Sequence, residues 1–152
     1  MIKIMKSETA DTRTCDVNAV TKEQLLKSSY SHIADVRQAM TMFEKILIEA
    51  GEKHDYTKID GIEQFFKDFK TDFKEHEWWD NHRKEERHHI SFSDGVKTDI
   101  DLIDVLEYIA DCVMAGMART GKVYDVKLSN ELLQLAFKNT VDKLISQVEV
   151  QQ

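Results

Sequence analysis

The sequence predicts an all-α protein that folds as a single domain. The chain contains no proline and only five glycines in 152 residues, whereas strands and tight turns need frequent punctuation by these two residue types. Several segments carry apolar residues at the three- and four-residue spacing of amphipathic helices. The composition, 41% hydrophobic and 32% charged, is that of a globular protein with a hydrophobic core. We divide the chain into an N-terminal arm over residues 1–20 and a helical domain over residues 21–150.

The charge and the cysteines exclude several classes of function. A formal net charge of −7 argues against a protein that wraps a nucleic acid polymer or lies on an anionic membrane surface. The N-terminal stretch Met-Ile-Lys-Ile-Met-Lys is too short and too polar for a signal peptide. No apolar run approaches the roughly 20 residues of a membrane helix. Cys15 and Cys112 follow no metal or redox spacing, so we expect reduced thiols in a cytoplasmic protein.

The first helix is expected to begin near residue 21. Residues 1–20 show little helical periodicity, and a short strand is expected there at Ile2–Ile4. Thr21 and Gln24 have the pattern of a capping box, and Gly51 is expected to end the helix or to mark a bend. Between these signals, one helix face collects mostly apolar side chains at helical spacing: Leu25, His32, Val36, Ala39, Phe43, Ile46, Leu47 and Ala50.

The middle of the chain contains a second amphipathic segment and a loop. The segment runs over Ile62–Phe73, and we assign its aromatic face to core packing: Phe65, Phe66, Phe69 and Phe73. Residues 90–99 are the expected exposed loop, in which Asp94–Gly95 signals a turn.

Two further helices are expected after this loop. Thr98 or Asp99 caps the first of them, and Gly121 ends it. Ser129 opens the last helix, whose apolar residues can pack onto the others. Three acidic residues lie together on the flank of the apolar stripe of the first of these helices: Asp104, Glu107 and Asp111. They are either a solvated edge or ligands that face a buried site.

Histidines and carboxylates gather in one region of the sequence. His54 and Asp55 are adjacent, and such a pair offers one nitrogen and one oxygen to a single divalent ion. Ligands of this kind suit zinc, iron, manganese and similar metals. Four of the six histidines lie within residues 75–89, beside both tryptophans, where neutral imidazoles around a metal explain the clustering better than a solvated charged helix. His32 is either a further ligand or a core histidine bonded to a backbone carbonyl.

The order of these groups resembles the HD-domain superfamily of metal-dependent phosphohydrolases. His32 lies on an early helix, and Asp111 lies on a later one. Between them, the stretch His54-Asp55-Tyr56-Thr57-Lys58-Ile59 matches the family's His-Asp pair, which is often followed at this interval by lysine. The resemblance covers roughly residues 25–120 and implies an HD-like helical bundle.

The same resemblance implies the metal ligands. One ion would be held by two histidines and two aspartates: His32, His54, Asp55 and Asp111. A second ion would share Asp55 as a bridging carboxylate and take the downstream histidines: His82 and one or both of His88 and His89. The run from Trp79 to His89 further resembles a small HD-like family of bacteria and phages. These histidines are closer together than the extra ligands of two-metal members usually are, so one ion and two ions both stay open.

The implied activity is hydrolysis of a nucleotide or a similar small phosphate ester. A bound divalent transition metal (Mn, Fe, Co, Ni or Zn) would lower the pKa of its water from about 16 toward 7 and neutralise charge on the phosphoryl oxygens. Asp55 and Lys58 are the implied catalytic residues. Lys58, Arg83 and Arg87 are candidate contacts for the substrate phosphate. The sequence contains no Gly-x-Ser-x-Gly motif, which agrees with attack by water rather than by a covalent nucleophile.

Three other functions stay open. An HD-type di-iron oxygenase uses the same kinds of ligand to oxidise a small organic substrate. A helical nucleoside triphosphate pyrophosphohydrolase binds magnesium through acidic residues, although its paired Glu-Glu-x-x-Glu signature is missing here. A non-catalytic protein could hold the metal for structure. The aromatic residues could line a pocket or the contact of a homodimer.

Overall fold

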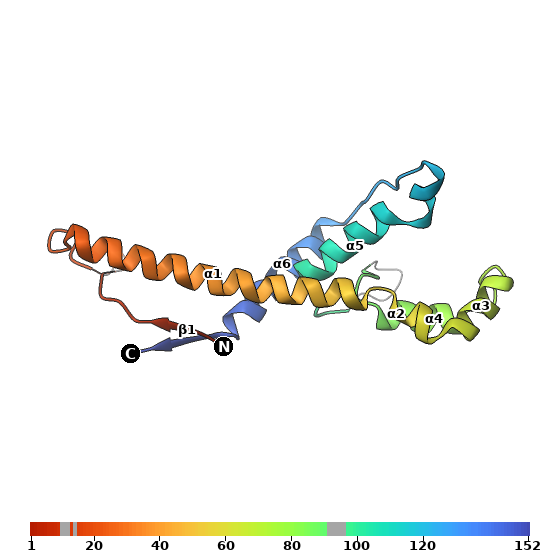
Figure 1. Ribbon diagram of the computed structural model, residues 1–152, viewed down its shortest axis with the longest axis horizontal. Coiled ribbons are helices and arrows are strands. Elements are labelled where there is room, and N and C mark those ends of the chain that lie inside the picture. The colour runs from red at the N-terminus through yellow and green to blue at the C-terminus, as the bar shows by residue number, and fades with distance from the viewer. Residues whose placement is uncertain (10–12, 14, 91–96) are drawn as a thin grey trace. The chain divides into compact units, whose positions relative to one another are not determined.

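The computed structural model describes residues 1–9, 13, 15–90 and 97–152. In chain order the elements are β1 (Ile2–Met5), α1 (Lys22–Lys53), α2 (Tyr56–Asp60), α3 (Ile62–Lys70), α4 (Glu77–Glu85), α5 (Leu102–Met114), η2 (Gly116–Thr120), α6 (Asn130–Ile145) and β2 (Val148–Gln151) (Figure 1). The protein is thus mostly helical, as predicted, but the all-α prediction is wrong for the two strands. The turn expected at Asp94–Gly95 lies outside the described residues. Within the described ranges, no helix combines the length and the apolar character that a membrane crossing requires.

The chain divides into two compact units, residues 1–45 with 142–152 and residues 46–141. In the first unit, β1 and β2 form a parallel pair with Ile2 opposite Val148. The strand expected at Ile2–Ile4 is therefore confirmed. Its partner comes from the opposite end of the chain, which the local sequence pattern does not reveal.

Helix α1 begins as predicted and ends later than predicted. The backbone N–H of Gln24 donates to Thr21 Oγ1 at 3.2 Å, and the N–H of Thr21 donates to Gln24 Oε1 at 2.9 Å, so the capping box is confirmed. The helix continues through Gly51 to Lys53. A glycine keeps its backbone N–H and weakens a helix by only about 1 kcal/mol, which does not by itself end it. The chain turns instead at Asp55, whose φ is 58°.

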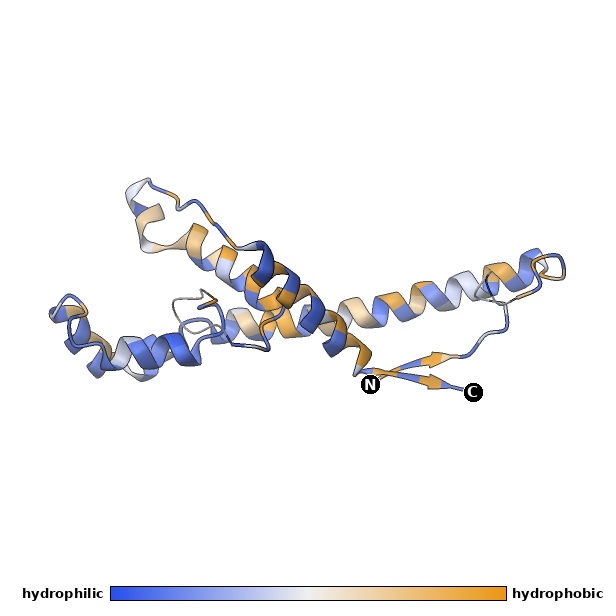
Figure 2. Ribbon diagram, turned by 180° about the vertical axis from the view of Figure 1, so that it is seen from behind, coloured by the Kyte–Doolittle hydropathy of each residue, from blue (hydrophilic) through white to orange (hydrophobic). Residues whose placement is uncertain are grey.

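The core of the second unit lies around α5 and α6. Its buried apolar residues form one cluster: Ile90, Ile100, Val105, Leu132 and Ala136. Figure 2 shows apolar residues concentrated on these two helices, whereas α2 to α4 are largely hydrophilic. Thr140 Oγ1 accepts a hydrogen bond from the backbone N–H of Leu102 at 2.8 Å. Helix α6 thereby fixes the start of α5, the helix that carries two of the acidic candidate residues.

The cap of α5 is Asp101, so the prediction of Thr98 or Asp99 is wrong. The Asp101 carboxylate accepts from the backbone N–H of Asp104, while the Asp104 carboxylate accepts from the N–H of Asp101. Asp99 is engaged elsewhere, because its carboxylate and its backbone carbonyl both accept from the Arg87 guanidinium at 3.1 Å. The reciprocal hydrogen bonds of Asp101 and Asp104 thus set the start of the helix at Asp101 rather than at Thr98 or Asp99.

Helix α5 ends at Met114, earlier than the predicted end at Gly121. The short 3₁₀-helix η2 follows, and Gly121 ends that segment in the left-handed region at a φ of 88°, as a glycine readily does. Ser129 then caps α6 as predicted, since its Oγ accepts from the backbone N–H of Leu132 at 3.2 Å.

Helices α3 and α4 are joined by a buried carboxylate. Asp68 is fully buried, and its Oδ2 accepts from the backbone N–H groups of Trp78 at 2.9 Å and Trp79 at 3.2 Å. The carboxylate thus satisfies the first turn of α4. Phe65 stacks on Trp78 with ring centroids 4.2 Å apart. The prediction of a buried aromatic face is wrong for two other residues of α3, because Phe66 and Phe69 are 57% and 60% exposed.

Candidate metal centre

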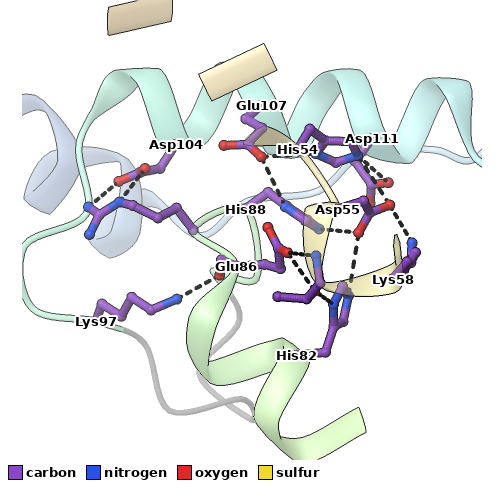
Figure 3. Close-up of polar contacts among 12 residues, drawn as sticks. His54, Asp55, Lys58, His82, Glu86, His88, Lys97, Asp104, Glu107 and Asp111 are labelled. Carbon is purple, nitrogen blue, oxygen red and sulfur yellow. Dashed lines mark hydrogen bonds and ion pairs between the residues drawn. The ribbon is translucent and has the colours of Figure 1, made fainter. Parts of the chain in front are cut away.

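The candidate site lies in the second unit, where α5, α2, the end of α1 and the end of α4 contribute side chains (Figure 3). His54 and Asp55 form the turn between α1 and α2. Asp55 adopts a left-handed backbone conformation, which aspartate tolerates better than most residues other than glycine. The remaining ligand candidates come from the end of α4, the segment after it and α5: His82, His88, His89, Glu107 and Asp111.

Asp55 lies at the centre of this group. Its Oδ1 is 3.5 Å from His82 Nε2 and 3.8 Å from His88 Nε2. Its Oδ2 is 3.4 Å from His54 Nε2, and the same nitrogen is 3.6 Å from Asp111 Oδ1. Asp55 Oδ1 is buried and has no hydrogen-bond partner among the described residues. The two oxygens of one carboxylate therefore face different imidazoles.

A single oxygen of Glu107 orients two of these imidazoles. Glu107 Oε1 lies 2.9 Å from His54 Nδ1 and 3.1 Å from His88 Nδ1. An ionised carboxylate only accepts hydrogen bonds, so both Nδ1 atoms carry the proton. In the neutral form of each ring, Nε2 then presents its lone pair, and in both rings Nε2 is the atom that faces Asp55.

The third imidazole is oriented through a buried threonine. The hydroxyl of Thr57 donates to Glu86 Oε1 at 2.6 Å, and this uses its only hydrogen. Thr57 Oγ1 must therefore accept from His82 Nδ1, which lies 2.7 Å away. Burial, with a smaller effect of His89, lowers the pKa of His82 to about 3, so this ring is neutral at pH 7. Its Nε2 lone pair faces Asp55 Oδ1.

Two carboxylates of the centre, Asp55 and Glu107, have a lowered pKa and stay ionised at neutral pH. Burial alone would raise the pKa of Asp55, but the hydrogen bond and the charge of Lys58, with smaller effects of His54 and His88, lower it overall. Burial likewise acts to raise the pKa of Glu107, and the hydrogen bonds from His88 and His54 outweigh it. Lone pairs and negative charge therefore converge on the space around Asp55, which suits a cation.

The spacing of these atoms fits metal coordination. Two ligands that each lie about 2.1 Å from one ion are roughly 3.0 to 3.4 Å apart. The contacts of the Asp55 oxygens with the three Nε2 atoms, at 3.4, 3.5 and 3.8 Å, exceed this by a few tenths of an ångström at most. Small side-chain rotations therefore suffice to bring the groups onto an ion.

Three groups of side chains in the described part of the chain could hold a metal ion. Each group has its ligand atoms within 4.8 Å of one another: His54 with His88 and Asp111, His82 with His88 and His89, and Glu86 with His88 and Glu107. His88 belongs to all three, and Asp55 belongs to none. Asp55 joins the centre through its contacts of 3.4 to 3.8 Å with three imidazole Nε2 atoms. His89 packs against its neighbours in this group, with its ring centroid 4.8 Å from that of His82 and 4.4 Å from that of His88.

The structure does not bring all of the sequence-predicted residues to this place. His32 lies on the part of α1 that belongs to the first unit, where it lines a hollow beside β1, and it is in none of the three ligand groups. Helix α1 runs unbroken from Lys22 to Lys53, so His32 lies within this helix and His54 directly follows its end.

The three predicted substrate contacts also differ in their surroundings. Lys58 contacts Asp55 Oδ2 directly and so lies at the centre. Arg83 pairs with Asp80 on the same helix at 2.6 Å. The guanidinium of Arg87 is held by both oxygens of Asp104, at 2.7 and 2.6 Å. We therefore keep only Lys58 in the site.

Two residues of the site, Thr57 and Glu86, were not predicted from the sequence, whereas Glu107 was one of the three acidic residues for which a solvated edge and a ligand role both stayed open. Glu107 lies four residues before Asp111 and thus on the same face of α5, a spacing that was visible in the sequence. The partners of Thr57 gave no such signal, because His82 and Glu86 lie 25 and 29 residues further along the chain.

A pocket of about 540 Å³ opens beside the centre. Its lining includes His54, Asp55, Lys58 and Asp111 together with apolar residues of α5. Its volume is within the range of small-molecule sites, roughly 300 to 1,000 Å³.

Comparisons of the chain with protein-family models, with curated proteins and with solved structures found no match.

Proposed function

We propose that this chain is a metal-dependent phosphohydrolase of the HD type whose centre holds two divalent ions bridged by Asp55. The observation that carries the proposal is the position of the Asp55 carboxylate. One oxygen faces His82 and His88, and the other faces His54. A buried carboxylate oxygen that faces imidazole lone pairs without a proton between them is unfavourable, and a bound cation between them would remove this cost.

The ligands divide naturally into two sets. The first ion would be held by His54, Asp55 and Asp111, and the second by Asp55, His82 and His88. His89 could complete the second set, because its ligand atom lies within 4.8 Å of those of His82 and His88. Nitrogen and oxygen ligands of this kind favour Mn, Fe, Co, Ni or Zn. When bound, such ions supply hydroxide from water near neutral pH and neutralise charge on a phosphoryl group.

The chain's own residues would position the substrate and the ligands. Lys58 contacts Asp55, and its side chain is 35% exposed, so its ammonium group can also reach an anion that enters the pocket. This cation would orient the phosphate of the substrate. Glu107 and the pair Thr57–Glu86 would fix the imidazoles that face Asp55, which is the usual role of groups behind metal-bound histidines.

The resemblance to the HD superfamily supports the proposal for most of these residues. It implies metal ligands at His54, Asp55 and Asp111, and a second set among the histidines from 82 to 89. The proposal departs from it at His32, which we leave out of the centre. The three protein ligands of the first ion would leave coordination positions for water and substrate, as catalytic sites require.

A di-iron oxygenase is the second candidate, because a carboxylate that bridges two sets of nitrogen and oxygen ligands also suits iron and oxygen chemistry. The apolar side of the adjoining pocket would suit a small organic substrate of such an enzyme. Oxygen consumption by the iron-loaded protein, without phosphate release from any ester, would favour this candidate over the hydrolase.

The proposal is tested first by metal analysis of the purified protein. We expect close to two ions per chain, fewer than one in Asp55→Ala, and about one in His82→Asn. Asp60→Ala and His76→Asn are matched controls, because both residues are exposed and lie in none of the ligand groups. Both control variants should keep two ions.

The second measurement is phosphate release from a panel of nucleotides and aryl phosphates with Mn, Co, Ni, Mg or Fe added. We expect turnover in the wild-type chain and in both controls, and none in Asp55→Ala. Tightly held metal with no turnover on any ester and no oxygen consumption would instead identify a non-catalytic metal-binding protein.

A further inference from the structure

The pocket beside the metal centre has a polar end and an apolar wall. The polar end consists of Lys58 and four residues of the centre: His54, Asp55, Glu107 and Asp111. The wall is lined by side chains without hydrogen-bonding groups: Leu47, Ala50, Leu106, Ala110, Met114 and Ala115. A ligand that fills this pocket therefore meets two different chemical environments.

The wall follows the polar end along α5. Leu106, Ala110 and Met114 are spaced by four residues and form a row on the helix. Glu107 and Asp111 form the neighbouring row. A ligand with its phosphate near Asp111 can thus lay its body along the apolar row. Leu106 and Met114 are 49% and 72% exposed, so a ligand that covers them gains hydrophobic stabilisation.

A second cation lies on the pocket lining, on an element that carries no ligand of the centre. Arg119 belongs to η2 and is exposed. Among the ion pairs formed by the described residues, none involves Arg119, whereas Lys58 is paired with Asp55. An arginine guanidinium binds a carboxylate or a phosphate through two parallel hydrogen bonds. Arg119 is thus a basic group of this pocket that can bind an anionic group of a ligand in addition to Lys58.

We propose that the substrate is a phosphate monoester with a flat or apolar body and a second anionic group, which Arg119 binds. This inference rests on the proposed hydrolase function, since the metal centre places the phosphate. A sugar phosphate fits less well, because its hydroxyl groups would lose their hydrogen bonds to water at the apolar wall and gain none. Arg119 and the row on α5 would then determine specificity, without a part in the chemistry.

The test uses phosphonates, whose carbon–phosphorus bond is not hydrolysed, and measures their dissociation constants from the metal-loaded protein by calorimetry. Phenylphosphonate should bind about tenfold more tightly than methylphosphonate, because its ring covers the apolar wall. Para-carboxyphenylphosphonate should bind about three- to tenfold more tightly again, because its carboxylate meets an exposed arginine. Para-phenylenediphosphonate tests whether a second phosphate serves as well as a carboxylate.

Two variants assign these gains to their residues. Arg119→Gln should remove the advantage of the carboxylate and leave phenylphosphonate binding unchanged. Met114→Ser should weaken both aryl ligands and leave methylphosphonate binding unchanged. Arg37→Gln is the matched control, because Arg37 is an exposed arginine that does not line this pocket, and it should change none of the constants.

The outcomes separate this inference from the proposed function. Equal binding of methyl- and phenylphosphonate would overturn the inference that the substrate has an apolar body. An unchanged preference for the carboxylate in Arg119→Gln would overturn the role of Arg119. In either case, bound metal and turnover of simple phosphate esters would leave the hydrolase proposal standing. A metal-loaded protein that binds no phosphonate would overturn both proposals.

Discussion

Replacing Glu107 by glutamine should weaken both metal sites at once. Glu107 Oε1 accepts hydrogen bonds from His54 at 2.9 Å and from His88 at 3.1 Å, and the proposal assigns these histidines to different ions. Glutamine keeps the size of the side chain and one accepting oxygen but removes the negative charge. Loss of a group behind a metal-bound histidine typically costs 10- to 100-fold in affinity. We therefore expect each dissociation constant to rise by about that factor, which corresponds to about 1.4 to 2.7 kcal/mol per ion.

Competition with a chromophoric chelator, titrated with Zn²⁺ or Mn²⁺, resolves the two constants. Thr57→Val is the informative comparison, because Thr57 orients only His82 and should weaken one ion alone. Glu85→Gln is the control, since Glu85 is an exposed residue at the end of α4 and its replacement should change neither constant. The reasoning is refuted if Glu107→Gln leaves either constant at its wild-type value while the protein stays folded.

Four further predictions concern stability and ligand count. The metal-free protein should lose stability below pH 6.5, because the unfolded chain protonates His82 there while the folded chain, in which the pKa of His82 is about 3, does not. Urea unfolding at pH 7, 6, 5 and 4, followed by tryptophan fluorescence, gives the unfolding free energy at each pH. Its decrease per pH unit should be smaller by up to about 1.4 kcal/mol in His82→Asn and unchanged in His76→Asn. Asp68→Ala should lower the unfolding free energy by about 1 to 3 kcal/mol, since two backbone N–H groups lose their acceptor, whereas Asp60→Ala should not. Ile100→Ala should cost about 2 to 5 kcal/mol because Ile100 is fully buried, with the 75% exposed Ile59 as the control position. His32→Ala should keep the full metal content, and loss of an ion would return His32 to the centre.

Local signals in the sequence predicted local features well. The capping box of Thr21 and Gln24 and the cap at Ser129 are confirmed, because each depends on atoms only three residues apart. The cap of α5 was predicted at the wrong residue, since several aspartates compete within a few positions. Which aspartate caps α5 also depends on a distant residue, Arg87. Arg87 binds Asp99 and Asp104, which lie 12 and 17 residues later in the chain.

The site was predictable as a set of residue types and not as a network. The pair His54–Asp55 is recognisable because it offers adjacent nitrogen and oxygen ligands, and the downstream histidines are recognisable because four of them lie within residues 75–89. Glu107 could be placed on the right helix face, but its two partners lie 53 and 19 residues earlier in the chain. No periodicity carries that information. His32 is a different case, because its own sequence context predicted one helix from near Thr21 to Gly51, which the structure extends to Lys53, and only the resemblance placed His32 with His54.

The number of protein ligands bears on whether the centre is catalytic. Structural metal sites are usually closed by four protein groups, whereas catalytic sites keep at least one position for water or substrate. With His32 outside the ligand groups, the first set comprises His54, Asp55 and Asp111. This set also lines the pocket of about 540 Å³, so the positions that the protein does not fill would face the space that a substrate can enter. A closed structural site would need a fourth protein ligand on that side, and the described lining there consists of Lys58, Arg119 and apolar side chains beside the carboxylate of Glu107, which already accepts from two histidines. With His88 on the second ion, as proposed, the first ion would therefore keep a position open to the pocket, whereas His88 joined to His54 and Asp111, which their spacing also allows, would close that site.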